Sequence, residues 1–185
     1  MQEISLNILD IAQNSVRADA SLIEISVIEN TGDSTLEVVI RDNGCGMTAE
    51  QVENVIDPFF TTRTTRRVGL GVPFFKMACE MTGGSFDIKS KVGVGTTVTA
   101  VFHTDSIDCM PLGNIEDTIH SLVTLNGHID FLYVRKIDEN DFTLDTKELR
   151  EILGDIPFNE PQVSMFIRNY IIENSNELAK NNSKG

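Results

Sequence analysis

The chain of 185 residues is 41% apolar, enough for one hydrophobic core or one core with a small appendage, and it has no apolar run of the ~18 residues that a membrane helix needs. Its net charge of −13 disfavours nucleic acid as a partner, because most of the surface would repel phosphate. Three cysteines without metal-ligand spacing, and a start without a charged and apolar leader, predict a reduced, cytoplasmic protein.

The first predicted elements are a helix and a hairpin. Apolar residues recur at helical spacing from about Ser5, a candidate N-cap, to Ala18. Apolar and polar residues then alternate in two segments, 21–29 and 35–42, with the turn NTGDS between them. We therefore expect a β-hairpin whose second strand ends at Asp42.

A short helix and a loop follow this hairpin. Thr48, with Gln51 three residues later, forms a capping box, which predicts a helix to about Val55. The loop, residues 58–68, is rich in threonine and arginine.

A longer helix and a second hairpin complete the first part of the chain. The helix is expected to begin within residues 69–72 and to end at Gly83 and Gly84, where glycine suits a left-handed cap. Alternating residues then predict strands at 85–91 and 95–103. This order predicts an α+β sandwich with helices on one face of a mixed, mostly antiparallel sheet.

The composition changes after about His103. Residues 1–104 carry a net charge of −5, and residues 105–185 carry −8. Helical spacing, alternation and a cap at Asp145 predict a helix, a hairpin and two further helices there. We therefore expect a first domain at 1–104 and a small α/β C-terminal extension at 105–185, whose role the sequence does not indicate.

The hexapeptide DNGCGM, residues 42–47, follows the second predicted strand directly. Asp42 offers an acceptor for an amino group such as that of adenine. Gly44 and Gly46 let the backbone turn sharply and let a flat ligand approach the main chain. The Asn-Gly pair also favours a simple turn, so the hexapeptide alone leaves both interpretations open.

Two further segments suggest a nucleotide. Gly69 and Gly71 stand at the start of a predicted helix, where free amides and the positive end of the helix dipole suit phosphate. Asp10 and Asn14 are one helical turn apart, so their side chains share a face. An amide oxygen can ligate Mg²⁺, and a carboxylate can orient water or accept a proton. Such a pair is also common on a solvated helix face.

In order and spacing, these segments resemble the motifs of the GHKL ATPases: sensor histidine kinases, gyrase, mismatch-repair ATPases and anti-sigma-factor serine kinases. The segments that look like the N box, first glycine box, F box, second glycine box and third glycine box are LDIAQNSVRADASLIEI, DNGCGM, DPFFTTR, GLGV and GTT. Five motifs in sequence are far more specific than any one of them. The resemblance covers about residues 3–103 and implies the Bergerat-type two-layer fold.

The resemblance implies ATP and Mg²⁺ as ligands and assigns roles to single residues. Asn14 would ligate the metal, while Asp42, with a water and Thr97, would bind the adenine amino group. The other implied cofactor-binding residues are Gly44, Gly46 and Met47 at the base, Thr61, Thr62 and Arg63 near the γ-phosphate, and Gly69, Leu70, Gly71 and Val72, whose amides face the phosphates. Residues 58–68 would be the ATP lid. Lys76 either approaches a phosphate or counters acidic surface.

Two departures from the family's pattern bear on activity. Asp10, the candidate catalytic base, stands where the hydrolytic branches and the serine kinases have glutamate. Its carboxylate lies one methylene closer to the helix, which predicts slow turnover. We expect no helical hairpin with a phosphoacceptor histidine before the first motif, and His120, on a predicted core-facing helix, is expected to be structural.

Two classes of function follow. The first is a regulatory kinase that transfers phosphoryl from ATP to Ser, Thr or His of a partner protein, which the kinase-like lid favours. The second is an ATP-switched binding module with little turnover, which Asp10 favours. A DNA repair or topology ATPase is disfavoured by charge and by the missing transducer domain. We expect a protein partner, with neither nucleic acid nor membrane, and leave a homodimer open.

Overall fold

The computed structural model describes residues 2–59 and 70–183. Its elements in chain order are α1 (Ile4–Arg17), β1 (Leu22–Asn30), β2 (Thr35–Asp42), α2 (Ala49–Ile56), α3 (Gly71–Met81), β3 (Ser85–Lys91), β4 (Gly95–His103), α4 (Ile115–Leu125), β5 (Asp130–Ile137), β6 (Asn140–Asp145), α5 (Thr146–Leu153) and α6 (Pro161–Ser183). Within the described ranges, no helix combines the length and the apolar character needed to cross a membrane.

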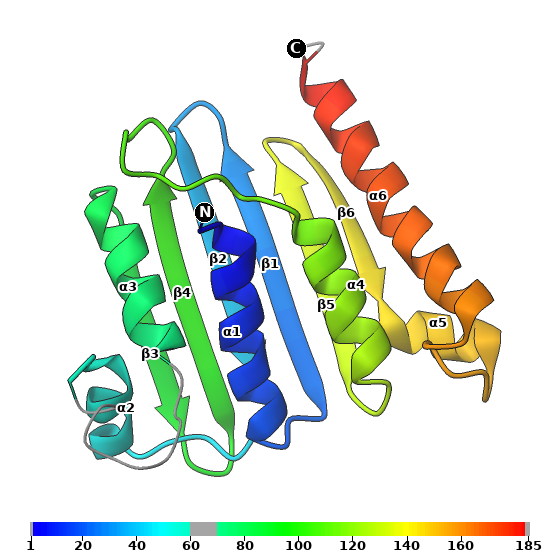
Figure 1. The fold of residues 1–185 in the computed structure, drawn as a ribbon, viewed down its shortest axis with the longest axis horizontal. Helices are drawn as coiled ribbons and strands as arrows, with labels where there is room; N and C mark the ends of the chain where they lie inside the picture. The colour runs from blue at the N-terminus through cyan, green and yellow to red at the C-terminus, as the bar shows by residue number, and fades with distance from the viewer. Residues whose placement is uncertain (1, 60–69, 184–185) are drawn as a thin grey trace.

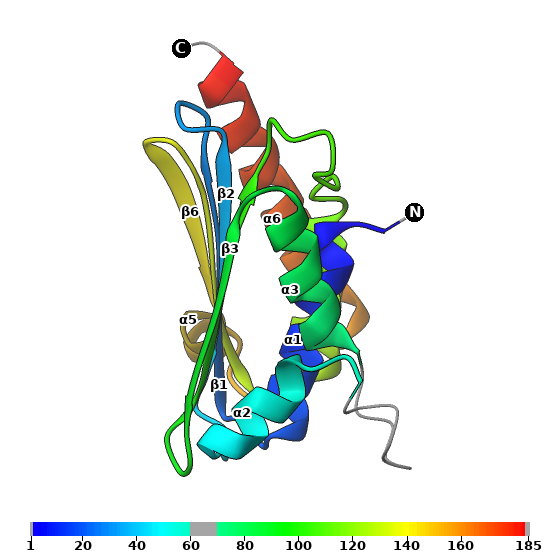
Figure 2. The same cartoon turned by 90° about the vertical axis from the view of Figure 1, so that its left-hand side faces the viewer.

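All six of these strands form one sheet in the order β3-β4-β2-β1-β5-β6. Neighbouring strands are antiparallel except β1 and β5, which are parallel. Helices α1, α3, α4 and α6 pack on one face of the sheet, and α5 joins β6 to α6 at one end (Figure 1 and Figure 2). This is the two-layer α+β arrangement that the sequence predicts.

The alternation of residues along the strands separates the two faces of the sheet. Ile23, Ile25 and Val27 of β1 are fully buried under the helices, while the residues between them are only half-buried. On α1, Ile8 and Ile11 cover the sheet from above. The hydrophobic core therefore lies between the sheet and its one helical layer.

The start of α1 differs from the sequence prediction. Ser5 is not the cap, because the helix already begins at Ile4 and Ser5 lies buried in its first turn. The amides of Ile4 and Ser5 instead donate to the backbone oxygens of Pro111 and Leu112, at 3.0 and 2.9 Å. The segment between β4 and α4 thus supplies acceptors that the first turn of a helix lacks.

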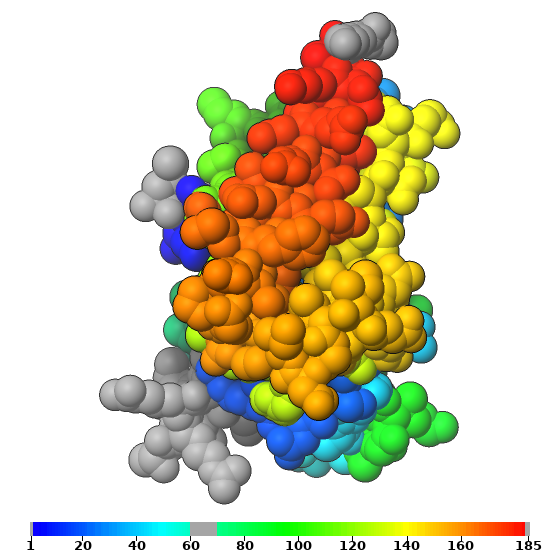
Figure 3. All heavy atoms as spheres, turned by 90° about the vertical axis from the view of Figure 1, so that its right-hand side faces the viewer, coloured from blue at the N-terminus to red at the C-terminus, as the bar shows by residue number. Residues whose placement is uncertain are grey.

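The residues after 104 continue the same sheet. β5 pairs with β1 from Leu22 opposite Asp130 to Glu29 opposite Ile137. Helix α6 lies along the β5–β6 hairpin and extends the helical layer (Figure 3). The predicted division at residue 104 stays a prediction, while the sheet and the buried core run across it without a break.

His120 has the structural place that its sequence context predicts. Its ring nitrogen Nε2 lies 3.0 Å from the backbone oxygen and 2.9 Å from the hydroxyl of Ser164. These contacts join α4 to α6, and the ion pair of Arg168 with Asp117 adds a second link between the same helices.

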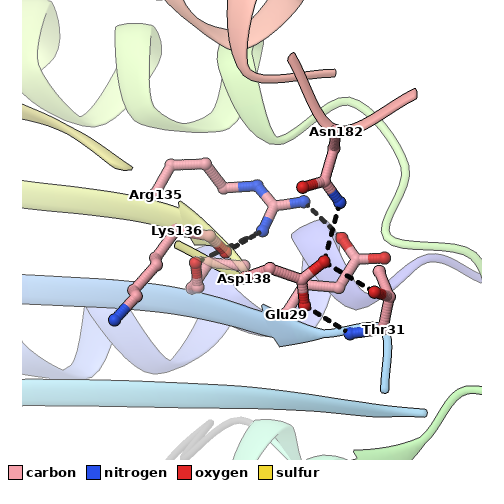
Figure 4. A network of polar contacts seen from close by, with 7 residues as sticks. Glu29, Thr31, Arg135, Lys136, Asp138 and Asn182 are labelled. Carbon is pink, nitrogen blue, oxygen red and sulfur yellow. Dashed lines mark hydrogen bonds and ion pairs between the residues drawn. The ribbon is translucent and has the colours of Figure 1, made fainter. Parts of the chain in front are cut away.

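A polar network holds the C-terminal part to the β1–β2 hairpin (Figure 4). Arg135 of β5 is only 7% exposed, and its Nη2 lies 2.8 Å from Glu29 Oε2 on β1. Asp138, in the β5–β6 turn, accepts from the amide and hydroxyl of Thr31 at 2.8 and 2.6 Å. Asn182, near the end of α6, donates to the same carboxylate at 3.0 Å. One aspartate thereby connects two turns and a helix end.

This network predicts a pH-dependent contribution to stability. The hydrogen bonds from Thr31, and then the one from Asn182, lower the pKa of the Asp138 carboxyl. The charge of Asp138 therefore stabilises the fold at any pH above the usual carboxyl pKa. This contribution is lost as the pH falls through the lowered pKa. Asp138→Asn keeps an acceptor and tolerates the residue's φ of 52° but removes the charge. We expect urea unfolding to show the variant less stable than wild type at neutral pH, with the difference shrinking on acidification.

The matched control is Asp141→Asn, a change at an exposed aspartate of β6. It removes a charge from the same hairpin and leaves the contacts of Asp138 in place. A stability difference for Asp138→Asn that stayed constant down to about pH 3 would contradict the role of its charge.

Candidate functional site

A cavity of about 180 Å³ lies between the sheet and helices α1, α2 and α3, where β2 ends and β4 begins. Its walls are mainly apolar, and its polar lining residues are Asn14, Ser15, Asp42 and Thr96. The apolar lining includes Ile11, Ile40, Met47, Val55, Val72, Ile88 and Val98. A mostly apolar hollow with a few convergent polar groups is typical of a small-molecule site.

Asp42 is the charged group of this cavity, and the protein itself holds its carboxylate. The hydroxyl of buried Ser15 donates to Oδ2 at 2.5 Å, and the amide of Gly44 donates to Oδ1 at 2.8 Å. Each carboxylate oxygen has a further lone-pair direction. Asp42 can therefore accept a charge-assisted hydrogen bond from a ligand while remaining fixed by its own fold.

The glycines of DNGCGM are explained by other segments of the chain that approach them closely. Gly46 has a φ of 72°, and a Cβ there would collide with the backbone oxygen of Lys91. A Cβ on Gly44 would lie 2.8 Å from the backbone oxygen of Ala18. Gly46 borders the cavity, whereas Gly44 does not. The protein's own backbone thus fills the space beside these two glycines, and it is not left open for a flat ligand.

The register of β4 brings Thr96, not Thr97, into this cavity. Thr96 pairs directly with Asp42 and lies on the same side of β4 as buried Val98. Thr97 lines a separate open hollow of about 550 Å³ on the other face of the sheet, together with Arg41; that hollow also reaches Asp42 and Thr96 at the strand ends. A shift of one residue along a strand reverses the direction of the side chain, which corrects the placement of Thr97.

Asn14 lines the cavity, and Asp10 lies one turn earlier on α1, outside the lining. The amide oxygen of Asn14 accepts from Arg17 Nη1 at 3.0 Å. Asp10 packs against the first residue of α3, since a Cβ on Gly71 would lie 3.0 Å from the Cβ of Asp10. Partial burial raises the pKa of the Asp10 carboxyl, and the charge of Arg17 offsets part of the rise.

The first turn of α3 borders the cavity through Val72. The N-cap residue, Leu70, makes no side-chain cap, so the first amides have no partner within the helix. Gly71 is the first helical residue and Pro73 carries no amide proton. Thr61, Thr62, Arg63 and Gly69 lie outside the described residues. Lys76 forms an ion pair with Glu80 at 3.0 Å, which matches the surface alternative for this lysine.

Sequence reasoning missed two residues of this site. Thr96 was identifiable from the alternation of side chains along a strand, because it lies two residues before the apolar Val98 and must face the helices with it. Ser15 carried no such signal, since its role depends on a contact with Asp42, 27 residues away in the chain.

Residues 1–106 match the family described as histidine kinase-, DNA gyrase B- and HSP90-like ATPase. The match covers more than half of the chain, and the protein belongs to this family. The family is the one whose motifs the sequence resembles, and the cavity lies where the N box and the first and third glycine boxes meet.

Similar proteins include a sensor protein and two solved structures. Sensor protein SrrB of Staphylococcus aureus is 34% identical over 102 residues, a match that covers 52% of this chain and only 17% of SrrB. The Aquifex aeolicus MutL ATPase domain complexed with ADP has a TM-score of 0.52 and 13% identity, covering 82% of this chain and 68% of that one. The N-terminal domain of a DNA repair protein has a TM-score of 0.53 and 14% identity, covering 84% and 58%. The structural matches are likenesses of fold.

The close approach at Gly46 is testable with a matched pair of substitutions. Gly93 has a similar φ of 77°, but nothing lies within 4 Å of a Cβ added there. We expect Gly93→Ala to cost about 1–2 kcal/mol through the left-handed backbone alone. Gly46→Ala should cost more, about 3 kcal/mol or above, because the backbone of Lys91 must also move. Urea unfolding measures both, and equal costs would contradict the account of Gly46.

Proposed function

We propose that the protein binds Mg-ATP and transfers its γ-phosphoryl group to a Ser, Thr or His side chain of a partner protein. The observation that carries the proposal is the carboxylate of Asp42 at the end of β2, held by Ser15 and Gly44 and facing an apolar cavity. Membership of the family supports it. The net charge of −13 favours a protein over nucleic acid as the partner.

The cavity suits the base of the nucleotide. It is smaller than the about 300–1,000 Å³ of ordinary ligand sites, so we place only the flat adenine in it and the sugar and phosphates outside. Asp42 would accept from the exocyclic amino group, and Thr96 would contact the same edge of the ring. The apolar walls would enclose the two faces of the ring and exclude water from this hydrogen bond.

The phosphates would lie at the first turn of α3. Its amides lack partners within the helix, and the positive end of the helix dipole favours anions. We assign the amides of Leu70, Gly71 and Val72 to this role, with Gly69 beside them. Thr61, Thr62 and Arg63 of the lid remain assigned to the γ-phosphate.

Asn14 fits a magnesium ligand. Its amide oxygen is the atom that accepts from Arg17, and amide and carboxylate oxygens are the ligands that Mg²⁺ takes in proteins. On binding the metal, the amide oxygen of Asn14 would give up its hydrogen bond from the Arg17 guanidinium and ligate Mg²⁺ instead. When bound there, Mg²⁺ supplies positive charge to the phosphate oxygens.

Asp10 is our candidate for the base that takes the proton of the acceptor hydroxyl. In the transfer, the acceptor oxygen forms a bond to the γ-phosphorus while the bond from that phosphorus to the ADP oxygen breaks. Partial burial raises the pKa of Asp10, which makes its carboxylate a better proton acceptor than an ordinary surface aspartate. Its contact with Gly71 places it beside the proposed phosphate site.

A second candidate is an ATP-switched binding module with little turnover. The short side chain of Asp10 favours it. A carboxylate that lies closer to the helix orients the attacking group less well, so turnover would be slow. In that case the acidic C-terminal part, with its net charge of −8, would hold the partner. Both candidates share the nucleotide site and differ in whether phosphate is transferred.

Binding is tested by calorimetry of Mg-ATP with wild type and Asp42→Ala. We expect wild type to bind and the variant to lose about 10–100-fold in affinity, since a hydrogen bond to a charged group is removed. Asp87→Ala, a change at an exposed aspartate on β3, is the control and should bind as wild type does. Wild type that binds no adenine nucleotide would refute the proposed function.

Turnover is tested with γ-phosphate-labelled ATP on Asp10 variants. We expect Asp10→Asn to bind ATP but to lose turnover, and Asp10→Glu to turn over about tenfold faster because the longer side chain restores reach. The wild-type rate should fall as the pH drops through the raised pKa of Asp10, because only the carboxylate accepts a proton. Binding without measurable turnover in wild type and Asp10→Glu alike would favour the switch.

A further inference from the structure

A row of three polar residues crosses the sheet from the cavity to the strand beside it. Thr96 on β4 pairs with Asp42 on β2 on one side and with Ser90 on β3 on the other. Each of the three is two positions away from an apolar residue that lines the cavity, so all three face the helices. Those apolar residues are Ile40, Val98 and Ile88.

The hydroxyl of Ser90 contacts three groups. The amide of Met47 donates to it at 2.8 Å, it donates to the backbone oxygen of Gly95 at 3.1 Å, and it lies 2.7 Å from the hydroxyl oxygen of Thr96. A hydroxyl has one proton to donate and two lone pairs to accept with. Either hydroxyl could donate in the contact between Ser90 and Thr96. The arrangement that also satisfies the oxygen of Gly95 has Ser90 donating to Gly95 and accepting from both Met47 and Thr96.

In this arrangement the proton of Thr96 is committed to Ser90. In the described part of the chain, the hydroxyl of Thr96 makes no other hydrogen bond. Its oxygen is left with lone pairs at the cavity, beside the carboxylate of Asp42, which also only accepts. Two neighbouring acceptors can both accept from an amino group. They cannot hydrogen-bond a carbonyl oxygen, because that oxygen is itself an acceptor and would be left without a donor.

We propose that Ser90 is a positioning residue that fixes Thr96 as a hydrogen-bond acceptor and so makes the cavity select an exocyclic amino group over an oxo group. The inference rests on the proposed function, because it takes a purine nucleotide as the ligand. Ser90 itself does not line the cavity, so it acts on the base through Thr96.

Removing Ser90 changes what Thr96 can do. Without that acceptor, the hydroxyl of Thr96 is free to rotate and to donate to an oxo group. A site whose polar groups are fixed rejects a mismatched ligand strongly, whereas a hydroxyl that can turn either way accepts both. The loss therefore falls on selectivity as well as on affinity.

The test is calorimetry of Mg-ATP and Mg-inosine triphosphate with the full chain. Inosine carries an oxo group in place of the amino group of adenine. We expect wild type to prefer ATP and Ser90→Ala to lower the ratio of the two affinities about tenfold, the equivalent of one hydrogen bond. Ser90→Thr restores a hydroxyl at this position and should recover the wild-type ratio. Thermal unfolding of each variant reports whether the fold is intact.

Equal weakening of both nucleotides in Ser90→Ala would mean that Ser90 only supports the fold, which overturns the inference and leaves the proposed function standing. Wild type that binds neither nucleotide would overturn both. If Ser90→Ala does not fold, Ser90→Cys fills the same space with a weak acceptor. It should lose the preference for ATP in the same way, and retention of that preference would overturn the inference.

Discussion

The hydrogen bond between Ser15 and Asp42 is the contact on which the cavity depends, because it joins the helical layer to the sheet where β2 ends. A partly buried carboxylate is costly unless donors surround it. Here α1 and the DNGCGM loop each supply one donor, while Gly95 brings β4 against the backbone of the same residue. The relative positions of a helix, a loop and two strands are therefore set around one side chain.

Helix α1 contributes to both ends of the proposed nucleotide site. Ser15 and Asn14 lie at the cavity, and Asp10 lies one turn away against the start of α3. A rigid helix keeps these groups at a constant spacing, whereas the residues proposed for the γ-phosphate lie between α2 and α3 in the sequence, outside the described residues. The proposed base site thus combines a helix, two strands and the DNGCGM loop, while the proposed phosphate site lies at the start of α3.

Local patterns predicted the local structure well. The three hairpins follow from alternating residues, and the capping box of Thr48 and Gln51 forms as expected. Contacts between distant segments were not predictable in this way. Neither the parallel pairing of β5 with β1 nor the acceptors that Pro111 and Leu112 provide for α1 have a local signal. Asp42, which the motif singled out, lines the cavity, and its role as an adenine acceptor stays a prediction. Choosing between Thr96 and Thr97 required the strand register.

The parallel insertion of β5 gives β1 a neighbour on each side. Cutting the chain at the end of the family motifs would leave β1 as an edge strand, with a row of unpaired amides and carbonyls beside Ile23, Ile25 and Val27. Such an edge is a template for pairing with other chains, so the shortened protein would be prone to aggregate. In this structure β5 occupies that edge, so the C-terminal part removes a site at which copies of the chain could pair.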